Sequence, residues 1–247
     1  MKVFLKKAAV ALWLVLAVLA AQPARADDAA AAKPKTIMFI GDSITAGLGL
    51  KFDEALPAQL EMRLKKEGLN VSVINAGVSG DTTADGLRRL EYSLKQKPDY
   101  VILALGANDM LNNVNPVTTR ENLRQMLETL KAHDLPVLLV GMQAFSNLGP
   151  DMAMAYLNMY KMLADKYETV FYPFLLKGVA LDPNLNQQDG IHPNAAGVAV
   201  IVDNILPSVA DLLVAQKAAP APPPQVFAAD PKKTAAAQKP ATTPKAK

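Results

Sequence analysis

Short apolar runs alternate with longer segments of helical periodicity between Thr36 and Leu213, and this alternation restricts the possible folds more than any other feature of the chain. Strands are expected at the short β-branched runs, and helices where leucines recur four residues apart, as at Leu56, Leu60 and Leu64. The expected strands are 36–40, 71–74, 100–105, 136–140 and 170–172, and the expected helices are 55–67, 83–96, 118–133, 152–167 and 193–213. Apolar strands alternating with helices are typical of a parallel sheet covered on both faces. We therefore predict a three-layer α/β/α sandwich with a five-stranded parallel sheet.

The N-terminal segment differs in composition from this central part. Residues 1–26 carry four basic and no acidic side chains, and an uncharged apolar run from Ala8 to Ala21 precedes Ala24-Arg25-Ala26. This pattern predicts a secretory signal peptide that is cleaved after Ala26, which would direct the protein to the periplasm. An uncleaved membrane anchor is the alternative.

Residues 215–247 are expected to form a disordered tail, because 24 of these 33 residues are Ala, Pro or Lys and offer little apolar surface to bury. The tail carries six lysines and one Asp. It either only solubilises the protein or makes weak contact with anionic cell-envelope polymers. The folded domain is then predicted to span 27–214.

The predicted domain is acidic, with 16 basic and 22 acidic side chains in 27–214. Nucleic-acid binding requires clustered Lys and Arg to neutralise phosphates, so this charge balance argues against a nucleic-acid partner. The chain contains no cysteine, which excludes disulfides, thiolate metal sites and a cysteine nucleophile. Any covalent chemistry must therefore use oxygen or nitrogen groups.

Polar, glycine-containing segments follow three of the predicted strands and precede the last helix. They are Gly41-Asp42-Ser43-Ile44-Thr45, Asn75–Thr83, Gly106-Ala107-Asn108-Asp109 and Asp189-Gly190-Ile191-His192-Pro193-Asn194. Ligands of parallel α/β sheets bind at the carboxyl ends of strands, beside the point where the strand order reverses. One such segment alone is typical of a turn with a helix cap, but four with complementary chemistry indicate a site.

Ser43 and His192 are candidates for a nucleophile and its general base. Ser43 follows the first strand, where it acts either as a nucleophile or as a helix N-cap. The chain has two histidines, and His133 ends a predicted helix, where we expect a structural role. His192 follows Asp189 by three residues, a spacing at which the carboxylate binds Nδ1 and leaves Nε2 free to face Ser43. The alternatives are that His192 is an ordinary loop or helix-cap histidine and that Asp189 forms an Asx turn.

An oxyanion hole is predicted at the same edge of the sheet. With the flavodoxin-like strand order 2-1-3-4-5, the ends of strands two, one and three lie side by side and bring Gly80, Ser43 and Asn108 together. The backbone N–H groups of Gly80 and Ser43 and the side-chain amide of Asn108 would then face a developing negative charge. The structural alternatives are a turn glycine at Gly80 and a helix cap at Asn108.

In these four segments the chain resembles the SGNH hydrolases, also called GDSL-type esterases, whose four sequence blocks carry Ser, Gly, Asn and His. The resemblance extends from about Thr36 to Leu213. It is greatest to the bacterial arylesterases and the periplasmic multifunctional thioesterase/lysophospholipases. The first block has Ile44 where the family has Leu, and the loop 110–114 lacks an Arg that is expected in close relatives.

The resemblance implies a complete set of catalytic groups. The implied triad is Ser43, Asp189 and His192, and the implied oxyanion hole is Ser43, Gly80 and Asn108. A monomer that works without a metal ion or other cofactor is also implied. Because this chain lacks the Arg expected in close relatives, the resemblance does not imply that it shares their acyl-chain preference.

Substrate contacts are expected from residues beside the four segments and after strand four, namely Asp42, Met110, Leu111, Phe145 and Ile191. The methionines around strand four and the following helix are expected to belong mostly to the core. Arg88 and Arg89 are interpreted as a solvated helix face.

Three other classes of protein fit the sequence less well. An α/β-hydrolase requires a G-x-S-x-G elbow, which neither 41–45 nor 77–80 supplies. A dinucleotide-binding fold requires G-x-G-x-x-G after strand one, but Phe52 stands where the third glycine would be. A non-enzymatic periplasmic ligand-binding protein stays an alternative, although such proteins usually have two lobes and more residues.

The predicted reaction is hydrolysis of a carboxylic ester or thioester through an acyl-enzyme on Ser43, with a small-molecule or lipid ester as substrate. Aryl esters, lysophospholipids, acyl thioesters and acetylated cell-wall sugars all present the same carbonyl group. Carbohydrate O-acetyl esterase activity is therefore the enzymatic alternative.

Overall fold

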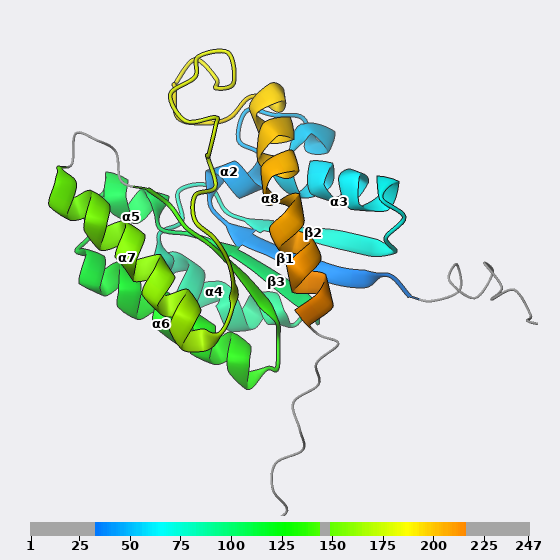
Figure 1. Cartoon of the computed structure of the whole chain (residues 1–247), viewed down its shortest axis with the longest axis horizontal. Helices are drawn as coiled ribbons and strands as arrows, with labels where there is room; N and C mark the ends of the chain where they lie inside the picture. The colour runs from blue at the N-terminus through cyan, green and yellow to red at the C-terminus, as the bar shows by residue number, and fades with distance from the viewer. Residues whose placement is uncertain (1–32, 144–148, 216–247) are drawn as a thin grey trace, which may run out of the picture.

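The computed structural model describes residues 33–143 and 149–215. The predicted signal peptide, Phe145 and the predicted tail beyond Ala215 lie outside these residues. Within them, strands and helices alternate along the chain (Figure 1).

The strands form one parallel sheet in the order β2-β1-β3-β4-β5, which confirms the predicted fold class and strand order. They are β1 (Lys35–Gly41), β2 (Val71–Gly77), β3 (Tyr100–Ala104), β4 (Val137–Val140) and β5 (Val170–Tyr172). The central strands are the most deeply buried, as Phe39 of β1 and Ile102 of β3 show. β2 is three residues longer than predicted because Asn75, Ala76 and Gly77 continue to pair with β1.

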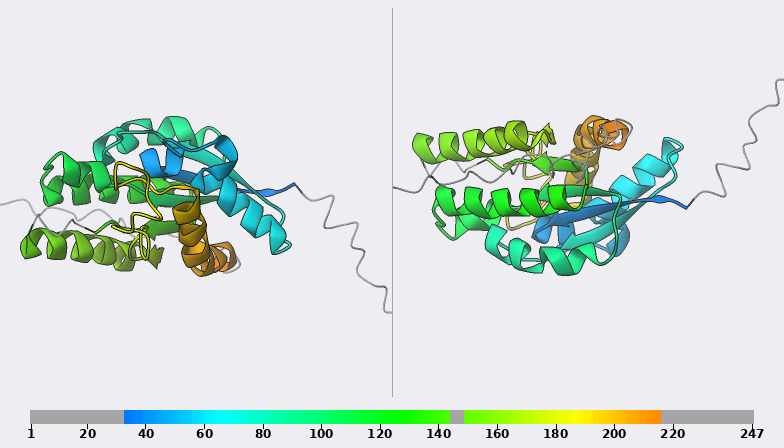
Figure 2. Two further views of the ribbon diagram at one scale, coloured as in Figure 1. Left: turned by 90° about the horizontal axis from the view of Figure 1, so that it is seen from above. Right: turned by 90° about the horizontal axis from the view of Figure 1, so that it is seen from below.

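Helices cover both faces of the sheet (Figures 1 and 2). α3 (Leu56–Lys66) packs against α8 (Ala195–Ala215) on one face. On the other face, α4 (Thr83–Leu94), α6 (Pro116–Ala132) and α7 (Pro150–Tyr167) lie in a row. Right-handed crossovers explain this division, because the connection from β1 runs outward to β2 and the next one runs back across β1 to β3.

α8 is the one helix of the described segments that is long and apolar enough to cross a membrane, judged by length and composition alone. Its buried residues include Ile201, Ile205 and Val209, which belong to the hydrophobic core of the domain. The helix also contacts α3, β4 and β5. Packing against the sheet therefore accounts for its apolar face.

Three short helical segments escape the periodicity pattern. They are α2 (Ser43–Ala46), the 3-10 helix Phe52–Glu54 and α5 (Ala107–Leu111). A single turn of helix has too few residues to show a periodic repeat of apolar positions. α2 and α5 follow β1 and β3 almost directly, so they present the polar residues of these two junctions at the edge of the sheet.

Candidate active site

The carboxyl ends of β2, β1 and β3 lie level with one another. Gly41 at the end of β1 lies opposite Gly77 of β2 and Ala104 of β3 in the register of the sheet. A side chain at Gly41 would collide with α2, because a Cβ atom there would lie 2.0 Å from Thr45 Oγ1. Glycine thus allows α2 to pack closely on the strand end, which fixes Ser43 at the first position of the helix.

Ser43, His192 and Asp189 form a continuous chain of hydrogen bonds. Ser43 Oγ lies 2.8 Å from His192 Nε2, and His192 Nδ1 lies 2.7 Å from Asp189 Oδ2. The predicted contacts between these three side chains are therefore present in the structure. Asp189 comes from the loop before α8, and Ser43 follows β1, so residues that are far apart in sequence meet here.

The Asp189 carboxylate determines which nitrogen of His192 carries the hydrogen. Asp189 Oδ1 accepts hydrogen bonds from the backbone N–H groups of His192 and Ile191, both at 3.0 Å. These bonds, and the bond from the imidazole, lower the pKa of Asp189 to about 2. An ionised carboxylate only accepts hydrogen bonds, so we assign the hydrogen to Nδ1. Nε2 is then the acceptor that faces the Ser43 hydroxyl.

Gln187 holds the loop of His192 against the loop that follows Ser43. Its backbone N–H donates to His192 O at 2.7 Å, and its side-chain Nε2 donates to Leu48 O at 2.7 Å and to Pro193 O at 3.0 Å. This link was not predicted, because nothing in the sequence distinguishes Gln187 from its neighbour Gln188.

The helix-cap alternatives for Ser43 and Asn108 are wrong. The N-cap of α2 is Asp42, whose Oδ1 accepts a hydrogen bond from the backbone N–H of Ile44 at 3.0 Å. The N-cap of α5 is Gly106, with a φ of 123°, and Asn108 lies inside that helix. Neither Ser43 nor Asn108 is therefore a helix cap, the role that most often explains a polar residue at a strand-to-helix junction.

The loop after β2 and helix α5 are joined directly beside Gly80. Asn108 Nδ2 donates to the backbone oxygen of Asp81 at 2.9 Å, which leaves the second hydrogen of the amide for another acceptor. Gly80 is exposed, has a φ of 87°, and a Cβ atom added to it would meet nothing within 4 Å. Gly80 is thus a turn glycine, as the structural alternative predicted. The position that a Cβ atom would take on this residue is open space.

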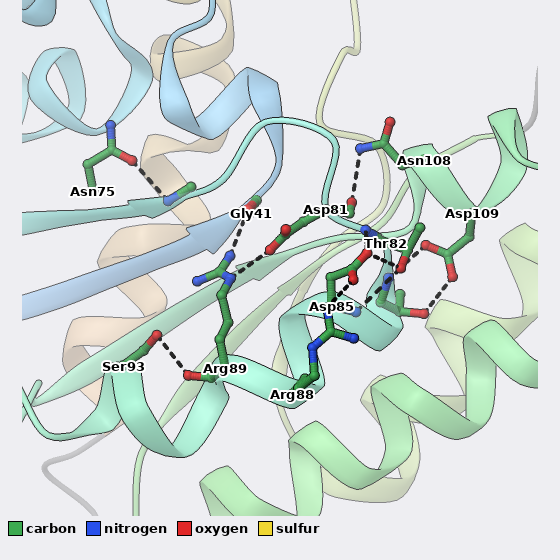
Figure 3. Close-up of polar contacts among 12 residues, drawn as sticks. Gly41, Asn75, Asp81, Thr82, Asp85, Arg88, Arg89, Ser93, Asn108 and Asp109 are labelled. Atoms are coloured by element: carbon green, nitrogen blue, oxygen red, sulfur yellow. Dashed lines mark hydrogen bonds and ion pairs between the residues drawn. The ribbon is translucent and has the colours of Figure 1, made fainter.

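Arg89 corrects the prediction that Arg88 and Arg89 form a solvated helix face. The side chain of Arg88 is 74% exposed and pairs with Asp85 one turn earlier in α4. The side chain of Arg89 is only 22% exposed, because it turns toward the sheet edge (Figure 3). Its Nε donates to Asp81 Oδ2 at 2.6 Å, and its Nη2 donates to Gly41 O at 3.1 Å.

Asp109 anchors α5 to two neighbouring helices. It is fully buried and accepts hydrogen bonds from the backbone N–H of Thr83 at 2.8 Å and from the Thr119 hydroxyl at 3.1 Å. The Thr83 hydroxyl also donates to it. The contacts of Asp109 therefore hold the neighbouring residue Asn108 at a defined place.

Asp42 does not take the role in substrate contact that was predicted for it. It is only 1% exposed, and it lies under α2 as its N-cap. One carboxylate oxygen, Oδ2, is buried without a hydrogen-bond partner among the described residues. Burial raises the pKa of Asp42 to about 6, because the charged form loses its hydration. The prediction failed because the position of Asp42 next to Ser43 in the sequence does not reveal which way its side chain points.

Asp42→Asn is expected to stabilise the protein more at pH 8 than at pH 4.5. The folded protein keeps the Asp42 proton up to about pH 6, whereas the unfolded chain releases it near the ordinary aspartate pKa of 3.8. Stability of the wild type therefore falls as the pH rises between these values and is constant above them. Asn keeps the N-cap acceptor and carries no charge, so the variant lacks this loss of about 2–3 kcal/mol. Thermal unfolding at both pH values measures the difference, and an equal gap at both would contradict the assignment.

A mainly apolar cavity of about 630 Å³ is lined by Ile44, Ala107 and Ile191, the chain neighbours of Ser43, Asn108 and His192. Its walls include Ile44, which follows Ser43, and the predicted substrate contacts Met110, Leu111 and Ile191. Met142 also contributes, whereas most other methionines near β4 do not line it. The wall contributed by the segment after β5 was not predicted; it consists of Phe174, Leu176, Ala180 and Leu181. This segment has no motif in the sequence, so only the fold brings it to the site.

Within 33–143 and 149–215, no group of three or more His, Asp or Glu side chains is arranged to hold a metal ion. The candidate site consists of the hydrogen-bonded side chains of Ser43, His192 and Asp189 and an apolar cavity.

The chain matches a known protein family over most of its described residues. The family model of the GDSL-like lipases and acylhydrolases matches residues 39–200, a span that contains Ser43, Gly80, Asn108 and His192. The chain belongs to the GDSL-like lipase/acylhydrolase family. Membership confirms the resemblance that was inferred from the four sequence segments.

Individual members of the family are similar over most of their length. Esterase TesA of Pseudomonas aeruginosa is 38% identical over 74% of this chain and 91% of its own length. Thioesterase 1/protease 1/lysophospholipase L1 of Escherichia coli K12 is 37% identical over 70% of this chain and 82% of its own. The crystal structure of AlinE4, an SGNH-hydrolase family esterase, has 42% identity and a TM-score of 0.63, and the match covers 74% of this chain and 98% of that one.

Proposed function

We propose that this family member hydrolyses carboxylic esters and thioesters by acyl transfer through Ser43. It is a serine esterase of the SGNH type, as its family and its relatives indicate. The observation that carries the assignment of Ser43 is the unbroken chain of hydrogen bonds from its hydroxyl through His192 to Asp189.

The proposed reaction begins when Ser43 Oγ attacks the carbonyl carbon of the ester and His192 Nε2 takes the hydroxyl proton. The ionised Asp189 holds the ring and stabilises the imidazolium that forms. His192 then gives its proton to the leaving alcohol or thiol, which departs and leaves an acyl group on Ser43. Water, deprotonated by His192, attacks the carbonyl carbon of this acyl-enzyme; His192 then returns the proton to Ser43 Oγ as its bond to the acyl group breaks and the carboxylic acid leaves.

The negative charge on the carbonyl oxygen requires hydrogen-bond donors that are in place before the reaction. We assign this role to the backbone N–H groups of Ser43 and Gly80 and to the side-chain amide of Asn108. Two observations support the assignment: the space that a Cβ atom on Gly80 would occupy is open, and no described residue accepts the second amide hydrogen of Asn108.

The cavity supports an acyl group larger than acetyl as the preferred substrate. Its volume of about 630 Å³ and its aliphatic and thioether walls suit a hydrocarbon chain, which gains free energy from leaving water. An O-acetyl esterase for cell-wall sugars would need little of this apolar volume. The names of the relatives, an esterase and a thioesterase/lysophospholipase, agree with an apolar acyl group joined to varied leaving groups.

The signal-peptide pattern of residues 1–26 supports export to the periplasm as the place where the protein acts. We further propose that the domain works as a monomer, with the basic tail as a solubilising extension or a weak contact to anionic cell-envelope polymers.

A fluorophosphonate probe tests the proposed function directly. We expect it to form a stoichiometric adduct on Ser43, identified by mass spectrometry of the labelled peptide, and Ser43→Ala to remain unlabelled. A panel of p-nitrophenyl esters of increasing chain length, with a lysophospholipid and an acyl-CoA, would then define the substrate. A wild-type protein that neither reacts with the probe nor hydrolyses any of these would support the alternative of a ligand-binding protein.

A further inference from the structure

We propose that Arg89 is a positioning residue of the reaction: through Asp81 and Gly41 it sets the oxyanion-hole groups relative to Ser43. This inference rests on the proposed function, since it assigns a task to a residue outside the triad and the oxyanion hole.

Arg89 joins the three strand ends on which the site is built. Its Nε donates to Asp81 Oδ2 at 2.6 Å in the loop after β2, and its Nη2 donates to Gly41 O at 3.1 Å at the end of β1 (Figure 3). The backbone oxygen of the same Asp81 accepts the amide hydrogen of Asn108, which follows β3, at 2.9 Å. One guanidinium thus connects a residue adjacent to Gly80, a residue two positions before Ser43, and, through Asp81, the side chain of Asn108.

The ion pair is well placed to determine local geometry. The side chains of Arg89 and Asp81 are 22% and 11% exposed, so solvent screens their attraction less than that of a surface pair. The planar guanidinium directs two separate N–H groups at two acceptors at a fixed angle, which an ammonium group does not do. The contact therefore fixes orientation as well as distance.

The loop that carries Gly80 has few other restraints. A backbone hydrogen bond from Asp81 N to Val78 O, 3.1 Å long, closes the turn around Gly80, and Val78 N donates to Gly41 O at 3.1 Å. Gly80 itself is exposed and has no side chain that packs. Without Arg89, Asp81 would keep the turn but lose its side-chain link to α4.

Helix α4 has an anchor of its own, independent of Arg89. Thr82 and Asp85 form a reciprocal capping box at its start, and Asp109 binds the backbone of Thr83. Removal of the Arg89 side chain should therefore disturb the strand-end loops more than the helix. Arg88 is the matched control, because it lies in the same helix and, among the residues that the structure describes, its side chain pairs only with Asp85 of that helix.

The test compares Arg89→Met with Arg88→Met on a soluble p-nitrophenyl ester. Active sites are counted with the fluorophosphonate probe, so that kcat refers to folded, reactive enzyme. We expect Arg89→Met to lower kcat about 10- to 100-fold with KM within about threefold, because a donor displaced by about 1 Å stabilises the transition state less. Arg88→Met should stay within about twofold of the wild type. Arg89→Lys, which keeps the charge and loses the second directed bond, should fall between wild type and Arg89→Met.

Two further variants separate positioning from a merely structural role. Asp81→Asn keeps the backbone oxygen that Asn108 uses and removes the carboxylate, so we expect a loss of kcat like that of Arg89→Met; this variant carries the test if Arg89→Met does not fold. In an Asn108→Ala background, Arg89→Met should lower kcat by a smaller factor than it does in the wild type, because one of the groups that it positions is already gone.

The outcomes distinguish failure of this inference from failure of the proposed function. If kcat per reactive site of Arg89→Met and Asp81→Asn stays within twofold of the wild type, Arg89 does not position the site. Equal losses in the Arg88 and Arg89 variants, or full additivity with Asn108→Ala, would also overturn it. A wild type that neither labels nor turns over would instead refute the proposed function, whatever the variants do.

Discussion

His192→Ala lowers kcat by about 10⁴- to 10⁶-fold, whereas His133→Ala retains most of the activity. His192 supplies the Nε2 atom 2.8 Å from Ser43 Oγ, and the alanine variant has no group to take the hydroxyl proton. Losses of this size are typical when the base of a serine hydrolase is removed, and the residual rate comes from the oxyanion hole and substrate binding. Steady-state hydrolysis of a short p-nitrophenyl ester measures the effect.

His133 is the matched control within the same chain. It is the C-cap of α6, its side chain is 46% exposed, and its Nε2 lies 3.4 Å from a carboxylate oxygen of Glu91. Its replacement removes a surface contact, which contributes about 1 kcal/mol or less to stability. Comparable loss of activity in both variants, with thermal unfolding unchanged, would contradict the assignment of His192.

Asn108→Ala is expected to lower kcat by about 10²- to 10³-fold with a much smaller change in KM. In its proposed role the amide donates to an oxygen whose negative charge develops in the transition state, so its loss corresponds to about 3–4 kcal/mol of transition-state stabilisation. Ser43 should still react with the fluorophosphonate probe, though more slowly, because the triad is intact. Kinetics and thermal unfolding on one preparation test both roles of the side chain.

The structure also gives Asn108 a modest structural contact, its hydrogen bond to Asp81 O. Loss of such a bond costs about 1 kcal/mol of stability, and it leaves turnover unaffected if the bond is the only function of the side chain. Near-normal kcat together with a lowered melting temperature would therefore refute the oxyanion role and leave Asn108 as a link between two loops.

The contacts among Ser43, His192 and Asp189 were predictable because their signals are local. Asp189 and His192 are three residues apart in one loop, so their contact needs only a turn of the backbone, and the structure shows it. Ser43 could be paired with His192 by elimination, since the chain has one other histidine and that one ends a helix.

Arg89 and Asp42 were misread for a shared physical reason. Arg88 and Arg89 are identical side chains on successive positions of one helix, yet one is solvated and the other turns toward the sheet. Asp42 precedes Ser43 but lies beneath α2 and is buried. The environment of each side chain depends on the elements packed against it, and these come from distant parts of the chain.

Local signals in the sequence are enough to predict the alternation of strands and helices, the four polar junctions and the three side chains of the proposed triad, because periodicity, turn chemistry and short spacings act within a few residues. The links that Arg89 and Gln187 make between the junctions, and the segments that enclose the cavity, are seen only in the folded protein. Those features arise when the sheet brings the ends of β1, β2 and β3 level and the segment after β5 folds back over them. They depend on contacts between residues separated by tens of positions, which no local pattern encodes.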